Sequence, residues 1–129
     1  GGFSVIKDVP KSTVYNLCDY INQSEYGPII PHTVMNKPPS AELRPDQKDS
    51  DSLPDYSILD PILRMYIEED MSVESIVNRG YAQSTVSEII KLVDRNEYKR
   101  RQSPPGVKIT SKNFGRDRRM PISNRFKSY

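Results

Sequence analysis

Residues 37–54 read KPPSAELRPDQKDSDSLP and divide the chain into two parts that both show helical periodicity. Four of these residues are prolines, and the residue before each proline is pushed toward extended backbone, so no helix can run through the segment. Only Ala41, Leu43 and Leu53 are apolar enough to be buried. A segment of this length without regular structure is either a functional loop or a disordered linker. Its serine, lysine and arginine side chains would suit a loop that closes over an anionic ligand.

The composition limits the class of protein. The chain has 129 residues, of which 35% are hydrophobic and eleven are proline, and this predicts one domain with a lean core and many loops. A single cysteine, Cys18, excludes an internal disulfide framework and a cysteine-ligated metal site, and the single histidine, His32, excludes a histidine-rich one. We therefore expect no metal site within the chain. No apolar run approaches the ~18 residues of a membrane span, and a reduced, cytoplasmic compartment fits the cysteine count.

Apolar residues recur at helical spacing in four segments. We expect one helical turn over 31–35 and helices over 9–22, 58–69, 73–78 and 84–101. Asp8 is expected to cap the first helix, and Ser57 with Asp60 to form a capping box for the next. Ser72 is expected to cap the short helix that follows, with Gly80 in the left-handed position just past its end.

Strand signals are weak and the end of the chain is basic. Phe3–Ile6 and Val107–Thr110 are the two candidate extended segments, so the sequence predicts a mainly α chain with long irregular loops. From Arg95 to Lys127 there are eleven basic residues against only Glu97 and Asp117. This basic C-terminal tail is either a solvated tail or a surface that contacts anions.

Two lysine positions admit a structural and a functional interpretation. Lys11 lies in the first turn of an expected helix, where it is either a surface lysine or helps the helix N-terminus to bind a phosphate. Lys99, Arg100 and Arg101 lie in the last turn of another, where cations complement the helix dipole. Three successive basic residues cover most of the circumference of a helix, so at least one of them is expected to point at something specific.

Residues 72–102 also suggest a helix-turn-helix module that binds nucleic acid. Ile76, Gly80 and Val86 have the relative spacing of that motif, and a basic helix follows. Two features argue against it: the position of Ile76 usually needs a small residue, and the basic residues lie at the far end of the second helix, away from where base edges are read.

Four motifs point to a particular family. They are GGFSVIKDVPK at 1–11, KPPSAELRPDQ at 37–47, NEYKRRQ at 96–102, and FGRDRRMPI at 114–122 with NRF at 124–126. In this order they closely resemble the C-terminal part of glutamine-dependent NAD synthetases, and the resemblance covers essentially all of the chain. The nucleic-acid alternative is less specific than this match.

The resemblance implies an ATP-dependent C–N ligase. ATP adenylates the nicotinate carboxylate of deamido-NAD and releases pyrophosphate, and ammonia, supplied from glutamine by a separate glutaminase domain, then displaces AMP. It also implies a Rossmann-like ATP-pyrophosphatase domain with a parallel sheet, an SGG-type phosphate loop and magnesium, in an enzyme that forms homo-oligomers. The chain contains neither that loop nor the glutaminase residues. We therefore expect it to be the C-terminal helical portion of the synthetase domain, inactive alone and with no partner among nucleic acids or membranes.

The resemblance also assigns site residues. Lys11 matches a lysine that contacts the ATP phosphates, and Ser40 matches a hydroxyl residue of a mobile loop that also contacts ATP. Lys99 matches a lysine that binds deamido-NAD, with Tyr98 beside it where ammonia-dependent relatives often have His. Those relatives carry an Asp near the position of Gly2 that touches the dinucleotide, and this chain lacks it. The resemblance assigns no catalytic side chain within the chain.

The expected organisation has four parts within one unit, 1–129. These are a first helix block at 1–36, a mobile substrate loop at 37–54, a helical block at 55–102 and the basic tail at 103–129.

Overall fold

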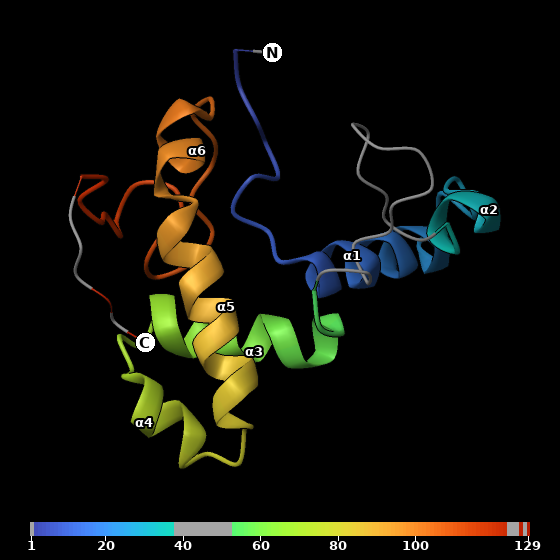
Figure 1. Cartoon of the computed structure of the whole chain (residues 1–129). Coiled ribbons are helices and arrows are strands. Elements are labelled where there is room, and N and C mark those ends of the chain that lie inside the picture. Colours follow the sequence, from blue (N-terminus) through green and yellow to red (C-terminus); the bar gives the residue numbers. More distant parts are fainter. Residues whose placement is uncertain (1, 38–52, 124–126, 128) are drawn as a thin grey trace.

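The chain is mainly helical. The structure, a computed structural model, describes residues 2–37, 53–123, 127 and 129. Within these residues Figure 1 shows helices α1 (Lys11–Gln23), α2 (His32–Met35), α3 (Tyr56–Ile67), α4 (Val73–Val77), α5 (Gln83–Arg95) and α6 (Glu97–Gln102). The predicted predominance of helix is confirmed. Among the helices of the described ranges, none is long and apolar enough to cross a bilayer.

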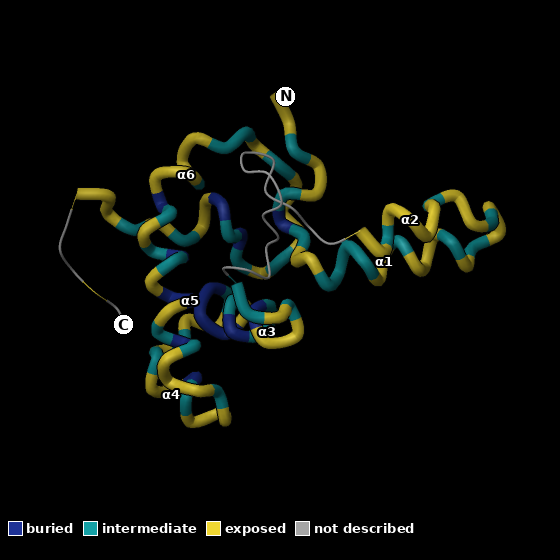
Figure 2. Tube along the Cα trace, turned by 45° about the vertical axis from the view of Figure 1, so that its right-hand side comes forward, coloured by how far each residue is buried: buried dark blue, intermediate teal, exposed yellow. Residues whose placement is uncertain are grey.

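The hydrophobic core lies where α3, α4 and α5 pack against one another. Each contributes the apolar stripe that its periodicity predicts, and the stripes meet because burying them removes apolar surface from water. The buried apolar side chains are Leu59, Ile62, Met65, Tyr66, Ile67, Ile76, Val86, Ile89, Ile90 and Val93. In Figure 2 the dark blue of buried residues concentrates on α3 and α5. This core is the platform from which the remaining segments extend.

The ends of α3 and α4 follow local capping chemistry, with one correction. The Ser72 side chain accepts a hydrogen bond from Ser75 N–H and caps α4, and Gly80 has φ +100°, so both predictions for this helix are confirmed. The predicted capping box of Ser57 and Asp60 is wrong. Asp55 caps α3 by accepting from Ser57 N–H at 2.8 Å, and the Asp60 carboxylate instead accepts from Ser12 N–H of α1.

The helix predicted over 84–101 is two helices, because Asn96 interrupts it. The Asn96 backbone has φ −89° and ψ 11°, and its side-chain amide donates to the Leu92 carbonyl at 2.7 Å. The Asn96 carbonyl then accepts from Lys99 and Arg100 N–H, which starts α6. An asparagine that hydrogen-bonds the preceding turn through its side chain competes with helix continuation.

Neither of the two candidate extended segments, Phe3–Ile6 and Val107–Thr110, forms a strand. In the described part of the chain the extended segments meet only in an isolated parallel bridge between Ser4 and Gly106, with Ser4 N–H donating to the Pro105 carbonyl at 2.8 Å. A Cβ on Gly106 would lie 2.4 Å from the Ser4 carbonyl oxygen, so glycine is needed for this approach. The ladder goes no further because the N–H groups of Ile109 and Thr110 donate instead to the Asp8 carboxylate.

Helices α1 and α2 extend away from the core and lie side by side (Figures 1 and 2). The Asn22 side chain of α1 donates to the Ile30 carbonyl at 2.9 Å and accepts from Ile30 N–H at 2.8 Å, just before α2, and its amide also lies 3.4 Å from Met35 Sδ within α2. Although α1 carries the expected apolar stripe, it has no buried residue, and Leu17 on that stripe is 45% exposed. The first helix therefore contributes its N-terminal end to the packing against α3 and leaves its apolar side open.

Substitution of Ile76 provides a test of how α4 packs on the core. Its side chain is fully buried, so Ile76→Ala should lower the free energy of unfolding by roughly 2–5 kcal/mol through lost burial and a cavity. Val34→Ala on the exposed face of α2 is the control and should change it by less than about 0.5 kcal/mol. Urea unfolding measures both. Equal effects would contradict the assignment of Ile76 to the core.

Candidate functional site

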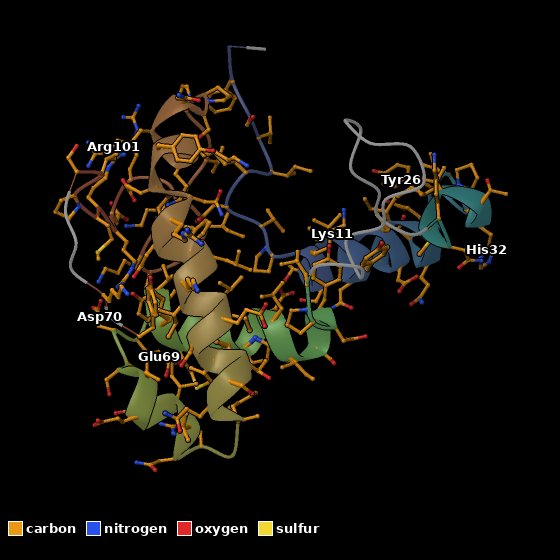
Figure 3. The ribbon with its side chains drawn as sticks, in the orientation of Figure 1. Lys11, Tyr26, His32, Glu69, Asp70 and Arg101 are labelled. Carbon is orange, nitrogen blue, oxygen red and sulfur yellow. The ribbon has the colours of Figure 1, made fainter. Side chains whose placement is uncertain are left out.

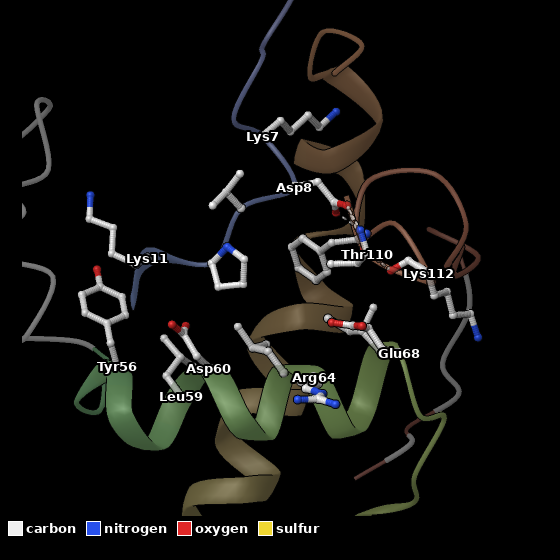
Figure 4. Close-up of a pocket in the computed structure, with 15 residues that line it drawn as sticks. Lys7, Asp8, Lys11, Tyr56, Leu59, Asp60, Arg64, Glu68, Thr110 and Lys112 are labelled. Carbon is white, nitrogen blue, oxygen red and sulfur yellow. Dashed lines mark hydrogen bonds between the residues drawn. The ribbon is translucent and has the colours of Figure 1, made fainter. Parts of the chain in front are cut away.

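Lys11 opens helix α1 and lies at the surface. Pro10 precedes it as the N-cap residue and makes no side-chain capping bond. The Lys11 ammonium is 6.0 Å from the centroid of the Tyr15 ring, and no ion pair is formed by it among the described residues. Figures 3 and 4 show its side chain extending from the start of α1 on the side that faces away from α3. A free ammonium in this place can contact an anion that approaches from solvent.

The segment that leads into α1 is held by Asp8, which is buried. Its carboxylate accepts hydrogen bonds from Ile109 N–H at 3.0 Å, Thr110 N–H at 3.1 Å, the Thr110 hydroxyl at 2.7 Å and Phe114 N–H at 3.2 Å. Burial raises the pKa of Asp8, but these hydrogen bonds outweigh it and hold the pKa below its ordinary value. The prediction that Asp8 caps the helix is therefore wrong, because its side chain joins two distant segments.

The N-terminus of α1 already has an anionic partner in Asp60 of α3. The Asp60 carboxylate accepts from Ser12 N–H at 3.0 Å and also from the Ser12 hydroxyl. Ser12 N–H belongs to the first turn, where backbone donors lack partners within the helix. This contact fixes the start of α1 on α3 and leaves the Lys11 side chain as the group that faces outward.

A cavity of about 250 Å³ lies beside Lys11, between the segment entering α1, helix α3 and the loop around Thr110 (Figure 4). Its walls are largely apolar, with Leu59 and Phe114 among them, and its rim carries charged side chains of both signs. Figure 4 shows Asp8 pointing toward Thr110 at one end and Tyr56 below Lys11 at the other.

The second candidate region is α6, which has two different faces. Tyr98 is 46% exposed, Lys99 is exposed, and the Lys99 ammonium is 6.0 Å from the centroid of the Tyr98 ring. Within the part of the chain that the structure describes, no carboxylate pairs with Lys99. The opposite face carries Glu97, whose side chain is only 2% exposed.

Glu97 is held by arginines. Its Oε2 accepts from Arg100 at 2.8 Å, its Oε1 accepts from Arg101 at 3.0 Å, and Arg119 lies 3.7 Å from Oε1. Burial raises the pKa of Glu97, but the hydrogen bonds from Arg101 and Arg100 and the nearby positive charge hold it below the ordinary value. Sequence reasoning missed this residue, although a lone acid three and four positions before two arginines has the spacing of helical ion pairs.

The predicted site residues do not form one cluster. Lys99 and Tyr98 lie on α6, while Lys11 starts α1, and Figures 1 and 2 show these helices on different sides of the core. Ser40, the third predicted contact, lies outside the described residues, as do positions 38–52 of the predicted loop and the NRF motif at 124–126. Among the described side chains, no group of three or more His, Cys, Asp or Glu is arranged to hold a metal ion.

Comparison with known proteins identifies the class of protein. The family model described as NAD synthase matches residues 1–103. The chain is 56% identical over 124 residues to the glutamine-dependent NAD(+) synthetase of Acinetobacter baylyi, covering 96% of this chain and 23% of that protein. It is 53% identical over 126 residues to the enzyme of the same name from Aquifex aeolicus, covering 98% of this chain and 22% of that protein. This chain therefore belongs to the NAD synthase family.

A solved structure supports the same family assignment. The glutamine-dependent NAD+ synthetase from Acinetobacter baumannii, in complex with adenosine diphosphate, matches with a TM-score of 0.54 and 44% sequence identity. The match covers 96% of this chain and 21% of that one. The chain thus spans between a fifth and a quarter of the length of the relatives it matches.

Asp8 provides a test of how the entry to α1 is held. Asp8→Asn removes the charge and places an amide N–H₂ against backbone donors, so it should lower the free energy of unfolding by about 2–3 kcal/mol at neutral pH. Because the pKa of Asp8 is depressed in the folded state, its contribution is fully present above the ordinary carboxyl pKa and is lost as pH falls through the folded value.

The difference between wild type and Asp8→Asn should therefore shrink on acidification below about pH 4. Denaturant unfolding at several pH values measures it, with Asp19→Asn on the exposed side of α1 as control. A difference that stayed constant down to pH 2 would contradict the proposed state of the Asp8 carboxylate.

Proposed function

We propose that this chain supplies substrate contacts to a glutamine-dependent NAD synthetase, which converts deamido-NAD to NAD at the expense of ATP. The observation that carries the proposal is membership of the NAD synthase family, and the state of the two lysines that the family resemblance assigns is compatible with it. Lys11 and Lys99 both lie at the surface without an ion pair among the described residues, whereas the neighbouring Arg100 and Arg101 are engaged by Glu97. Membership of the NAD synthase family and the relatives' names support the reaction.

Lys11 is proposed to contact the ATP phosphates. Phosphates are bound by ammonium groups as point charges, and an exposed lysine at a helix N-terminus places that charge where the helix dipole also favours anions. The related structure from Acinetobacter baumannii holds adenosine diphosphate, which supports nucleotide binding by the whole enzyme. Ser40 is proposed to reach the same nucleotide from the loop at 37–54.

Lys99 is proposed to contact deamido-NAD, with Tyr98 beside it. The dinucleotide carries a pyrophosphate and a nicotinate carboxylate, both of which are strong acceptors for a charged donor. The Tyr98 ring beside the ammonium gives a flat apolar surface next to a cation, which suits a ligand made of planar rings and anionic groups.

The reaction needs positive charge near the phosphates of ATP. No bond to a residue of this chain is proposed to form or break. A carboxylate oxygen of deamido-NAD attacks the α-phosphorus of ATP and pyrophosphate leaves, so negative charge develops on the phosphate oxygens. Ammonia then attacks the acyl carbon, AMP departs with the oxygen, and the nitrogen loses a proton. Lysines that bind and orient the two substrates stabilise the charge and hold the reacting atoms together. No residue of the chain is assigned as nucleophile or general base.

The remainder of the proposal concerns the complete enzyme. The helices described above would be the C-terminal portion of a Rossmann-like ATP-pyrophosphatase domain, joined to a glutaminase domain that supplies ammonia. The basic tail at 103–129 would complete that portion. The described residues do not fit a metal centre, so we derive no step through the magnesium that accompanies ATP. A homo-oligomeric state and a cytoplasmic location stay predictions.

A nucleic-acid-binding module at residues 72–102 is not favoured. Helices α4 and α5 do pack together, with Ile76 and Val86 fully buried in the core they share with α3, but packing of this kind is general for neighbouring helices and is not specific for the motif. The family match covers this region completely and explains it as part of a synthetase.

Steady-state kinetics of the complete synthetase tests the two lysines. Losing a charge-assisted hydrogen bond to a bound phosphate or carboxylate costs about 1.5–3 kcal/mol, which is roughly 10- to 100-fold in kcat/KM. Lys99→Ala should raise the KM for deamido-NAD more than that for ATP. Lys11→Ala should raise the KM for ATP more than that for deamido-NAD, or lower kcat if the Lys11 contact tightens as pyrophosphate leaves. Ser40→Ala should have a milder effect on the kinetics.

The matched control is Lys91→Ala, an exposed lysine of α5 outside the predicted sites, which should leave both KM values within twofold. Glutaminase activity measured alone should be unchanged by all four substitutions. The assignment of Lys99 would be wrong if Lys99→Ala left kcat and the deamido-NAD KM within twofold of wild type.

A further inference from the structure

Glu97 is a buried carboxylate in a short, otherwise basic helix. Removing a carboxylate from water is costly unless both oxygens are paired. Here each oxygen has its own arginine, at 2.8 Å from Arg100 and 3.0 Å from Arg101. A buried and fully paired carboxylate adds little to overall stability compared with apolar packing. It does fix the positions of its partners, because losing one arginine leaves a buried charge unpaired, which is strongly unfavourable.

The two arginines connect Glu97 to three other parts of the chain. Arg100 donates to the Val93 carbonyl at the end of α5 at 2.5 Å, and its guanidinium carbon lies 4.8 Å from the centroid of the Phe114 ring. Arg101 donates to the Met120 carbonyl at 3.0 Å. The cluster therefore fastens α6 both to the core helix before it and to the segment 114–120 after it.

Helix α6 depends on this cluster for its orientation. It has only six residues, and a helix so short does not hold its shape or direction without tertiary contacts. Residues 97, 100 and 101 share one face of a helix by their spacing, while 98 and 99 project from the remaining circumference. Fixing the first face against the protein thus fixes the direction in which Tyr98 and Lys99 point.

We propose that Glu97 is a positioning residue for deamido-NAD, which acts by holding the exposed Tyr98–Lys99 face of α6 in place. Its carboxylate does not touch the substrate. It engages Arg100 and Arg101 in ion pairs, which prevents both arginines from competing for the dinucleotide and leaves Lys99 as the cation of α6 that no carboxylate of the described residues pairs with. This inference rests on the proposed function, since it assumes that Lys99 contacts deamido-NAD.

Glu97→Gln in the complete synthetase tests the inference. The substitution keeps the side-chain shape and removes the charge that holds both arginines. We expect the KM for deamido-NAD to rise about tenfold, because displacement of a contact group by about 1 Å is enough for losses of this size. The KM for ATP and the glutaminase activity should stay within twofold, which a general loss of folded enzyme would not produce.

A double-mutant cycle separates positioning from mere stabilisation. If Glu97 acts through Lys99, then Glu97→Gln introduced into the Lys99→Ala enzyme should change the deamido-NAD KM by less than twofold. Full additivity of the two effects would overturn the inference, as would an equal rise in both KM values. If Lys99→Ala alone has no effect, the proposed function of Lys99 fails. If Lys99→Ala raises the KM and Glu97→Gln does not, only the positioning role fails.

Two further variants keep the test decisive if Glu97→Gln does not fold. Arg101→Gln weakens the same cluster at its more exposed partner, 44% exposed at the side chain, and should raise the deamido-NAD KM about threefold. Asp70→Asn is the control: it loses an exposed carboxylate that pairs with Lys112 and Arg118, at a position of φ +51° that asparagine tolerates. It should leave both KM values within twofold. A rise in the deamido-NAD KM for Asp70→Asn equal to that for Arg101→Gln would overturn the inference.

Discussion

The contact on which the placement of the segments around the core depends is the carboxylate of Asp8. It accepts four hydrogen bonds from Ile109, Thr110 and Phe114, residues that lie more than a hundred positions further along the chain. Three of the donors are backbone N–H groups, which would each need another partner if the carboxylate were absent. Together with the bridge between Ser4 and Gly106, this side chain closes the chain on itself and sets where α1 begins relative to the segment that carries Phe114 onto the core.

Glu97 holds α6, the second candidate region, in place as Asp8 holds the entry to α1. Both acids lie buried next to the basic end of the chain, and both have a pKa below its ordinary value because hydrogen bonds outweigh the cost of burial. Asp8 binds backbone donors and so fixes a chain path, whereas Glu97 binds arginine side chains and so fixes a helix face. Glu97 engages Arg100, Arg101 and Arg119 in this way, which distinguishes Lys99 from the arginines that follow it.

The sequence predicts the parts of this fold that depend on near neighbours. Apolar periodicity located the helices, and Ser72 and Gly80 marked the ends of α4, since these signals act within one or two turns. Prediction from the sequence fails where a group distant in the chain determines the structure. Asp8 is predicted to be a helix cap because it precedes Pro10, but its hydrogen-bond partners lie near position 110. The interruption at Asn96 was missed because asparagine is tolerated within helices as well as at their ends. Lys11 and Lys99 could be assigned only by family resemblance, because exposure alone does not distinguish a ligand contact from a surface lysine.

The pairing of Ser12 with Asp60 changes how Lys11 must work under the proposed function. A helix N-terminus normally offers backbone N–H groups to a phosphate, but here a carboxylate of α3 already takes one of them. A phosphate approaching α1 therefore meets a negative charge beside the helix start, and the Lys11 ammonium has to offset that charge as well as bind the ligand. Removing the ammonium leaves the Asp60 carboxylate with its Ser12 donors but without the lysine charge, so the loss for Lys11→Ala should lie toward the upper end of the roughly 10- to 100-fold range. Lys11→Ala combined with Asp60→Asn should then recover part of the ATP affinity, even though each change alone removes a contact.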